Sequence, residues 1–97
     1  MKGLKFEWDK RKENTNKRKH GISFGEARTV FYDENAIQFH DPDHSSEEDR
    51  FILLGVSHAL NTLVVCHCFR EEETTVRIIL ARKADKDETK AYWGKRK

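Results

Sequence analysis

Three cationic side chains stand in a segment whose other residues are typical of a buried strand. Thr75 to Ala84 reads TVRIILARKA, so Arg77, Arg82 and Lys83 lie among β-branched and aliphatic residues. A guanidinium group stays charged and needs an acceptor inside the protein, solvent at a sheet edge, or an anionic ligand such as phosphate. The segment is therefore a candidate floor for a nucleic-acid site.

Residues that can move protons precede this segment. His67, Arg70 and the acidic run from Glu71 to Glu73 stand just before it. Cleavage of RNA by its own 2'-hydroxyl requires a base near that oxygen, positive donors around the phosphorus, and a proton source for the leaving 5'-oxygen. Arginine and lysine supply the donors, and histidine or glutamate the proton transfer. This hairpin therefore contains the residue types that such a reaction needs.

Ordinary ion pairs are the alternative explanation of both arginines. Arg77 and Arg82 would then pair with Glu71, Glu72 or the acidic loop of residues 41–49, and neither would bind phosphate. On a regular strand, Arg77 and Lys83 also face one side and Arg82 the other. The two arginines can serve one site only if the strand twists, bulges or ends between them.

His67 and its neighbours Cys66 and Cys68 also have structural explanations. An imidazole on a central strand often bonds a backbone carbonyl, which is the alternative to a catalytic role for His67. Consecutive strand residues alternate between faces and cannot converge on one metal, and a disulfide between residues two apart on a strand is strained. We expect reduced core cysteines and no metal or cofactor.

The elements that position these residues follow from the apolar spacing. Apolar and charged residues alternate over 4–8, which predicts a short strand, and Asp9 is placed to cap a helix from Lys10 to His20 that stops at Gly21. That helix has almost no apolar residue, so we expect it to be solvated and held by few contacts. Ser23 and Glu26 form a capping-box pattern that opens a second helix with a core face.

The second half of the chain is richer in strands. Strands are predicted over residues 36–40, 51–56, 62–69 and 75–84, the DPDHS segment at 41–45 is predicted to be a turn, and a terminal helix is predicted over 85–93. The 97 residues suffice for one domain, 1–97, with one modest core. The fold class is α+β: an N-terminal strand and two helices, then a four-strand antiparallel meander and a C-terminal helix.

The charge is nearly balanced but unevenly distributed. There are 19 basic and 17 acidic residues, and the basic ones crowd into residues 10–20, where Lys17 and Lys19 are candidate phosphate contacts. A solvated helix face is the alternative explanation of that run. We see no apolar run that approaches a membrane span and no signal-peptide core, so we expect a reducing cytoplasm and no membrane partner.

An ordered set of motifs over nearly the whole chain resembles the BrnT family of bacterial toxins. The matching residues are FEWD at 6–9, Asn14, KHGISF at 19–24, Ala27, Val30, Phe31, DPDHS at 41–45, Arg50, Gly55 and RIILARKA at 77–84.

This resemblance implies a RelE-like ribonuclease that cleaves RNA without metal, arrests translation and growth, and is neutralised by a BrnA-type ribbon-helix-helix antitoxin. Operator DNA would be bound only through the complex with that antitoxin. By position, the family's last-strand arginines fall on Arg77 and Arg82, and the acidic residue of the preceding hairpin falls on Glu72. The family usually has serine where this chain has Leu80.

The resemblance and the residues together give one set of roles. Arg77 and Arg82 are the expected catalytic cations, Glu72 or His67 handles a proton, and Arg70, Lys83 and the first helix hold the RNA backbone. A non-catalytic protein-interaction domain is the alternative function. A DNA-binding regulator is less consistent with the sequence, because no helix combines a core face with base-reading residues in a helix-turn-helix arrangement.

Overall fold

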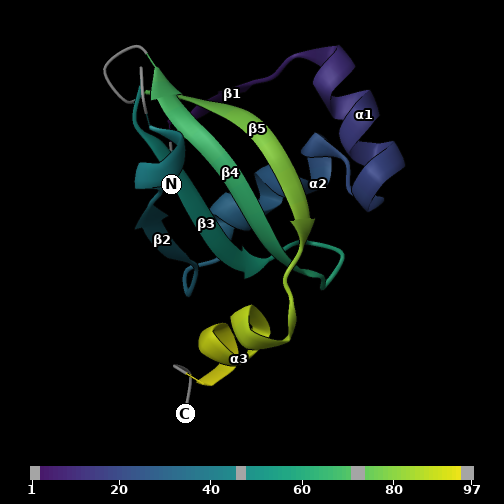
Figure 1. The fold of residues 1–97 in the computed structure, drawn as a ribbon, viewed down its shortest axis with the longest axis vertical. Helices are drawn as coiled ribbons and strands as arrows, with labels where there is room; N and C mark the ends of the chain where they lie inside the picture. The colour runs from purple at the N-terminus through teal and green to yellow at the C-terminus, as the bar shows by residue number, and fades with distance from the viewer. Residues whose placement is uncertain (1–2, 46–47, 71–73, 95–97) are drawn as a thin grey trace.

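The computed structural model describes residues 3–45, 48–70 and 74–94. Their elements follow the expected order of strand, two helices, four strands and helix (Figure 1). The strands are β1 (Lys5–Glu7), β2 (Ile37–His40), β3 (Arg50–Val56), β4 (Thr62–Arg70) and β5 (Thr75–Lys83). The helices are α1 (Lys10–His20), α2 (Phe24–Thr29) and α3 (Lys86–Gly94), and 3-10 turns span Val30–Tyr32 and Pro42–His44.

One five-stranded sheet organises the molecule. Its strand order is β1-β5-β4-β3-β2, in which β2 to β5 form an antiparallel meander and β1 is added in parallel to β5. The predicted α+β architecture with its meander is therefore confirmed. The parallel position of β1 places Glu7 directly opposite Arg77.

The two faces of the sheet differ. The face that we call the closed face packs on α2 and the Val30–Tyr32 turn and holds the main hydrophobic core, which includes Phe24, Phe31, Leu53, Leu63, Val65, Val76, Ile78 and Ala81. The other face, which we call the open face, is turned toward the viewer in Figure 1, with α2 behind the sheet. Helix α3 covers the lower end of the open face, where Tyr92 packs on Leu54 and Val64.

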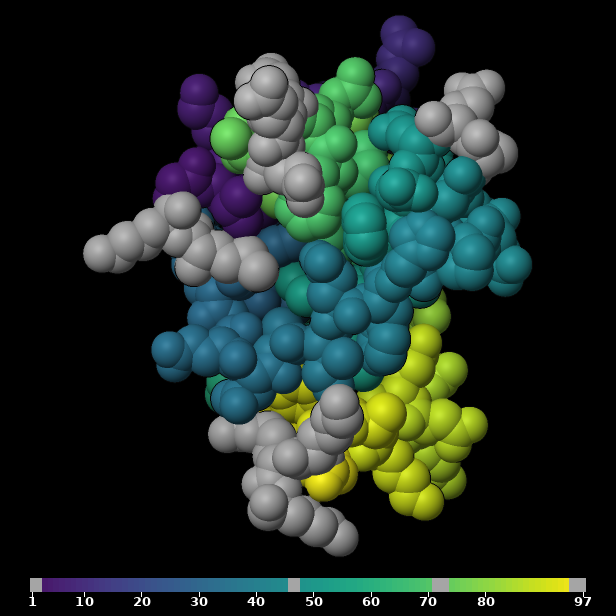
Figure 2. All heavy atoms as spheres, turned by 90° about the vertical axis from the view of Figure 1, so that its left-hand side faces the viewer, coloured from purple at the N-terminus to yellow at the C-terminus, as the bar shows by residue number. Residues whose placement is uncertain are grey.

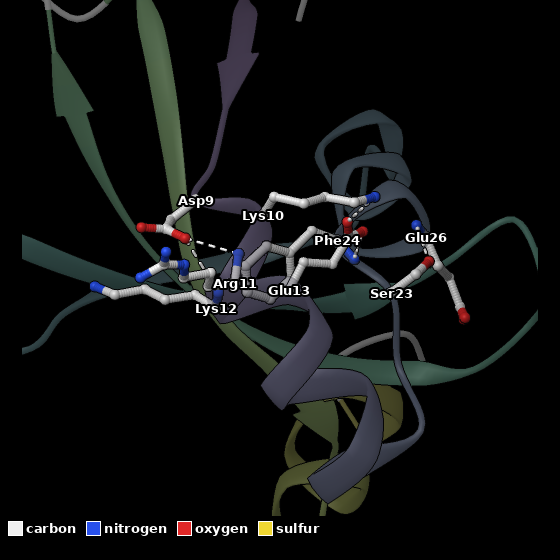
Figure 3. Close-up of polar contacts among 8 residues, drawn as sticks. All are labelled: Asp9, Lys10, Arg11, Lys12, Glu13, Ser23, Phe24 and Glu26. Atoms are coloured by element: carbon white, nitrogen blue, oxygen red, sulfur yellow. Dashed lines mark hydrogen bonds and ion pairs between the residues drawn. The ribbon is translucent and has the colours of Figure 1, made fainter.

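Helix α1 begins and ends where the sequence predicts. The Asp9 carboxylate accepts hydrogen bonds from the backbone N–H groups of Arg11 and Lys12 (Figure 3), and Gly21 ends the helix with a φ of 71°. Only Glu13 and Asn16 are buried on α1, and both are polar. The helix is therefore attached to the domain by polar contacts and not by an apolar stripe.

Asn16 attaches α1 to the edge of the sheet. Its Nδ2 donates to the carbonyls of Ala81 (2.7 Å) and Ile22 (2.9 Å), and its Oδ1 accepts from the N–H of Ala81 (3.1 Å). Strand β1 pairs only with residues 75–77 of β5. The Asn16 amide thus takes over the place of a neighbouring strand at Ala81 and satisfies both of its backbone groups.

Glu13 attaches α1 to the start of α2. Its Oε2 accepts a hydrogen bond from the N–H of Phe24 at 2.9 Å, and its Oε1 receives one from Lys10 at 3.3 Å (Figure 3). Burial raises the pKa of this carboxyl, but the Phe24 and Lys10 hydrogen bonds outweigh it and hold the pKa below its usual range. Glu13 therefore shares the capping of α2 with Ser23, whose Oγ accepts from the N–H of Glu26 at 3.0 Å.

Candidate functional site

A β-bulge in β5 decides which residues of this strand share a face. His67 of β4 lies opposite Ile78, whereas the preceding Cys66 lies opposite Leu80, so Ile79 is an extra residue in β5. Such a bulge reverses the alternation of all residues that follow it. The sequence had required a twist, a bulge or a strand end between the two arginines, and the bulge at Ile79 meets that condition.

Arg77 and Arg82 consequently both belong to the open face. Arg77 lies opposite Cys68 and Arg82 opposite Val64, two positions of β4 that face the same side. Lys83 lies opposite Leu63, a residue of the closed-face core. The face assignment expected for a regular strand is thus wrong. Arg82 lies on the open face with Arg77, whereas Lys83 lies on the closed face.

One end of the open face carries a cluster of three arginines. Arg50, Cys68, Arg77 and Glu7 lie side by side across β3, β4, β5 and β1, and Arg70 follows Cys68 by two residues on the same face. We call Arg50, Arg70 and Arg77 the arginine cluster. Two of them, Arg70 and Arg77, share one carboxylate, that of Glu7, and Arg50 lies on the other side of Cys68 from Arg77.

The Glu7 carboxylate occupies only some of the N–H donors of the arginine cluster. Its Oε2 accepts from Arg77 Nη1 at 2.8 Å and lies 3.7 Å from Arg70 Nε. The Nε of Arg50 is buried and has no hydrogen-bond partner among the described residues. Glu7 and Arg70 are more than one third exposed, and ion pairs at such exposure contribute little stability, so a phosphate group can compete for these guanidinium groups.

The other end of the open face holds Arg82 against α3. Arg82 donates from Nη1 and Nη2 to the two carboxylate oxygens of Glu88 at 2.8 and 2.9 Å. The hydrogen bonds with Glu88 raise the pKa of Arg82, and Arg82 in turn lowers the pKa of Glu88. The side view of Figure 2 places α3 at the opposite end of the molecule from β1.

The two arginines are therefore separate cationic positions on one face. Four residue rises separate Arg77 from Arg82 once the bulge is counted, which is about 13 Å along the strand. Each binds a different carboxylate. The ion-pair alternative is right that both arginines are paired, but among the described residues the acceptors are Glu7 and Glu88.

His67 lies on the closed face, away from the arginines. It is fully buried against Phe31 and two other phenylalanine rings, with Nδ1 3.1 Å from the carbonyl of Val65 and Nε2 3.1 Å from Gln38 Oε1. Burial lowers the pKa of His67 to about 4. The structure does not bring this imidazole together with Arg77 or Arg82, and the backbone-bonded core histidine is the interpretation that its contacts support.

The remaining predicted residues divide into three groups. Glu72, with Glu71 and Glu73, lies outside the described residues. Lys19 lines a groove between α1 and β5, whereas Lys17 is exposed on α1 and does not line it. Arg70 belongs to the arginine cluster, and Lys83 is exposed at the end of β5.

Sequence reasoning missed Arg50 and Glu7 as members of this site. Arg50 alternates with Ile52 and Leu54 along β3, and all three face the open side. That alternation was present in the sequence and places Arg50 on the same face as Leu54. No pattern in the sequence placed Glu7 at this site, because only the parallel pairing of β1 with β5 brings it to Arg77.

The cysteines are free thiols on the open face. Cys68 is buried, and burial, followed by a hydrogen bond with Glu48, raises its pKa to about 11. Burial also raises the pKa of Cys66. Both therefore stay protonated near neutral pH and are poor nucleophiles. Within the described part of the chain, we find neither a group of three possible metal ligands nor a helix long and apolar enough to cross a membrane.

Comparison with known proteins bears on the family and the fold of the chain. A family model described as "Ribonuclease toxin, BrnT, of type II toxin-antitoxin system" matches residues 8–88. Among solved structures, the chain is similar to the crystal structure of the Brucella abortus ribonuclease toxin BrnT, with a TM-score of 0.65 and 24% identity over 86% of this chain and 99% of that chain. At this identity the likeness shows a shared fold. No curated protein sequence matches.

Proposed function

This chain belongs to the BrnT family of ribonuclease toxins of type II toxin-antitoxin systems, and we propose that it is a metal-independent endoribonuclease that cleaves RNA on the open face of its sheet. The observation that carries this proposal is the arginine cluster. Arg70 and Arg77, which share the Glu7 carboxylate, and Arg50 on the other side of Cys68 supply the positive donors that a phosphate group needs.

The proposed reaction is transfer of the phosphoryl group within the RNA. The ribose 2'-oxygen loses its proton to a carboxylate and attacks the phosphorus, the bond to the 5'-oxygen breaks, and that oxygen takes up a proton. The products are a 2',3'-cyclic phosphate and a 5'-hydroxyl. Arg77, with Arg50 and Arg70, would stabilise the charge that develops on the non-bridging oxygens. Arg82 would hold the RNA farther along β5.

Two carboxylates are candidates for the general base. The resemblance to the family assigns this role to Glu72, which follows β4 along the chain. Glu7 is the second candidate, because its carboxylate lies 2.8 Å from Arg77 Nη1, where a reacting phosphate would bind. His67 is not included, since its ring is buried on the other face of the sheet.

The test is a cleavage assay on single-stranded RNA with the purified chain in EDTA. We expect cleavage in EDTA at the rate seen with Mg²⁺, and loss of cleavage in the Arg77→Gln/Arg82→Gln double variant. Glu7→Gln and Glu72→Gln separate the two candidate bases, because only loss of the true base flattens the acid limb of the pH–rate profile. Cleavage that stops in EDTA would contradict metal independence, and RNA left intact by the parent chain would contradict the enzyme.

We also propose that a BrnA-type ribbon-helix-helix antitoxin neutralises the toxin and that operator DNA is bound only by their complex. The resemblance supports this partner, and family membership implies an antitoxin. Expression of the chain alone should arrest bacterial growth, and co-expression of the partner should restore it. The Arg77→Gln/Arg82→Gln variant should fail to arrest growth while remaining folded by circular dichroism.

A non-catalytic interaction domain is the second candidate. The observation in its favour is that Arg77 and Arg82 both already bind carboxylates. On that hypothesis the purified chain leaves RNA intact even at low salt, and the double variant still binds the partner.

A further inference from the structure

A groove lies between α1 and the edge of β5, beyond the end of β1. Its volume is about 250 Å³. The residues that line it are Arg11, Lys12, Thr15, Asn16, Lys19, His20, Ile79 and Leu80. Asn16 fixes the distance between the two walls through its hydrogen bonds to Ala81. The groove is therefore a built feature of the fold, held open by a buried amide.

One wall of the groove is cationic. Arg11, Lys12 and Lys19 recur at helical spacing on the side of α1 that faces β5. Figure 3 shows the Arg11 and Lys12 side chains extending together, away from Lys10 and Glu13. None of the three forms an ion pair with a carboxylate of the described residues, since Asp9 bonds only the backbone N–H groups of Arg11 and Lys12. These cations differ in this respect from Arg77 and Arg82.

The other wall is apolar. Ile79 and Leu80 line it and are only half-buried. The bulge is responsible, because Ile79 is the extra residue and Leu80 lies opposite Cys66 on the open face. His20 adds a flat ring at the end of the helix. A ligand that fits has one apolar, planar part and at least one negative charge.

We infer that this groove binds one nucleotide of single-stranded RNA, with its base against Ile79 and Leu80 and its phosphates on Arg11, Lys12 and Lys19. The inference rests on the proposed function and names where the substrate lies beyond the arginine cluster. Leu80 stands between Arg77 and Arg82 on the open face, so a strand that leaves the groove crosses β5 directly onto the arginines. An acidic peptide would bind the cations but would not need the apolar wall.

The test measures binding of a labelled, uncleavable 2'-O-methyl oligonucleotide by fluorescence anisotropy over a range of salt concentrations. The groove variant is Arg11→Gln/Lys19→Gln, and the control is Arg28→Gln/Lys90→Gln, which removes the same number of positive charges from exposed positions outside the groove. Each phosphate contact with a single strand contributes about 0.7 to the slope of log affinity against log salt. We expect the groove variant to lower that slope by about 1.4, and the control to leave it unchanged.

A second variant tests the apolar wall of the groove. Leu80→Ser should weaken binding of the full oligonucleotide about tenfold, as expected for loss of an apolar contact with the base, and leave the salt slope unchanged. It should not alter binding of an oligonucleotide that is abasic throughout. Equal losses for both oligonucleotides, or polyglutamate competing as well as RNA, would overturn the inference in favour of an acidic partner.

Cleavage and binding assays on the same variants separate an inactive enzyme from a groove that does not bind RNA. If the parent cleaves RNA and the groove variant cleaves with the same KM as the control, the groove is not a subsite, and the proposed enzymatic function is still correct. If the parent never cleaves RNA but groove-dependent binding of the oligonucleotide is present, the subsite stands and the proposed reaction is wrong.

Discussion

The two faces of one sheet use polar side chains in opposite ways. On the closed face, His67 is fully buried and both ring nitrogens have a partner, and at the edge of β5 the amide of buried Asn16 is likewise satisfied. On the open face, Arg70 and Arg77 share one half-exposed carboxylate, and the buried Nε of Arg50 has no hydrogen-bond partner within the described part of the chain. A buried group with all its partners stabilises the fold, whereas a partly exposed guanidinium group that shares its carboxylate with another is available for a ligand.

The largest expected effect comes from the open face, where a substitution should abolish activity without lowering stability. Arg77→Gln should lower the cleavage rate about 10²- to 10³-fold, the usual cost of removing one donor to a developing oxyanion. It should change the free energy of unfolding by less than about 1 kcal/mol, because its ion pair is partly exposed. Cleavage assays and urea denaturation measure both. The control is Arg28→Gln on α2, and equal loss of activity in both variants would refute the assignment.

His67 should make stability depend on pH. Its pKa is about 4 in the folded chain against 6.5 in the unfolded one, so the unfolded state binds the proton first as pH falls. The stabilisation is complete above about pH 6.5 and is lost toward pH 4, with a limit of about 3 kcal/mol. Urea denaturation between pH 7 and 4 should show a smaller slope in His67→Gln. The exposed His58→Gln is the control and should keep the slope of the parent.

Asn16 should stabilise the fold although it lies on a helix with almost no apolar residue. Asn16→Ala leaves the N–H and carbonyl of Ala81 without their partner, which we expect to cost about 2 kcal/mol. Asn14→Ala, an exposed substitution of the same residue type on the same helix, should cost less than about 0.5 kcal/mol. Equal denaturation midpoints for the two variants would show that α1 is held by other contacts.

The smallest effect concerns the end of the open face that α3 covers. Glu88→Gln removes the charge that holds Arg82 and should tighten binding of uncleavable RNA a few-fold. The accompanying loss of stability should be below about 1 kcal/mol, since both side chains are about one third exposed. Asp87→Asn, next to it on α3, controls for the loss of one negative charge. Equal gains in the two variants would indicate a general charge effect and no specific release of Arg82.

Much of the fold was predictable because its signals are local. The alternation at 4–8, the Asp9 cap and the Gly21 stop define β1 and α1, and the apolar runs with short polar loops define the meander. The turn at 42–44 and the absence of a Cys66–Cys68 disulfide also followed from local geometry. The solvated character expected of α1 was correct for most of its residues, but Glu13 and Asn16 were missed, because polar anchors leave no hydrophobic periodicity.

The sequence by itself determined which residue types are available: a strand rich in cations, a basic helix, and the family to which their order belongs. Only the tertiary structure decided which of them meet. The bulge at Ile79 moves Arg82 onto the face of Arg77 and moves Lys83 off it, while the parallel pairing of β1 brings Glu7 to the arginines. Register and strand order depend on contacts between residues far apart in the chain, so no local pattern specifies them.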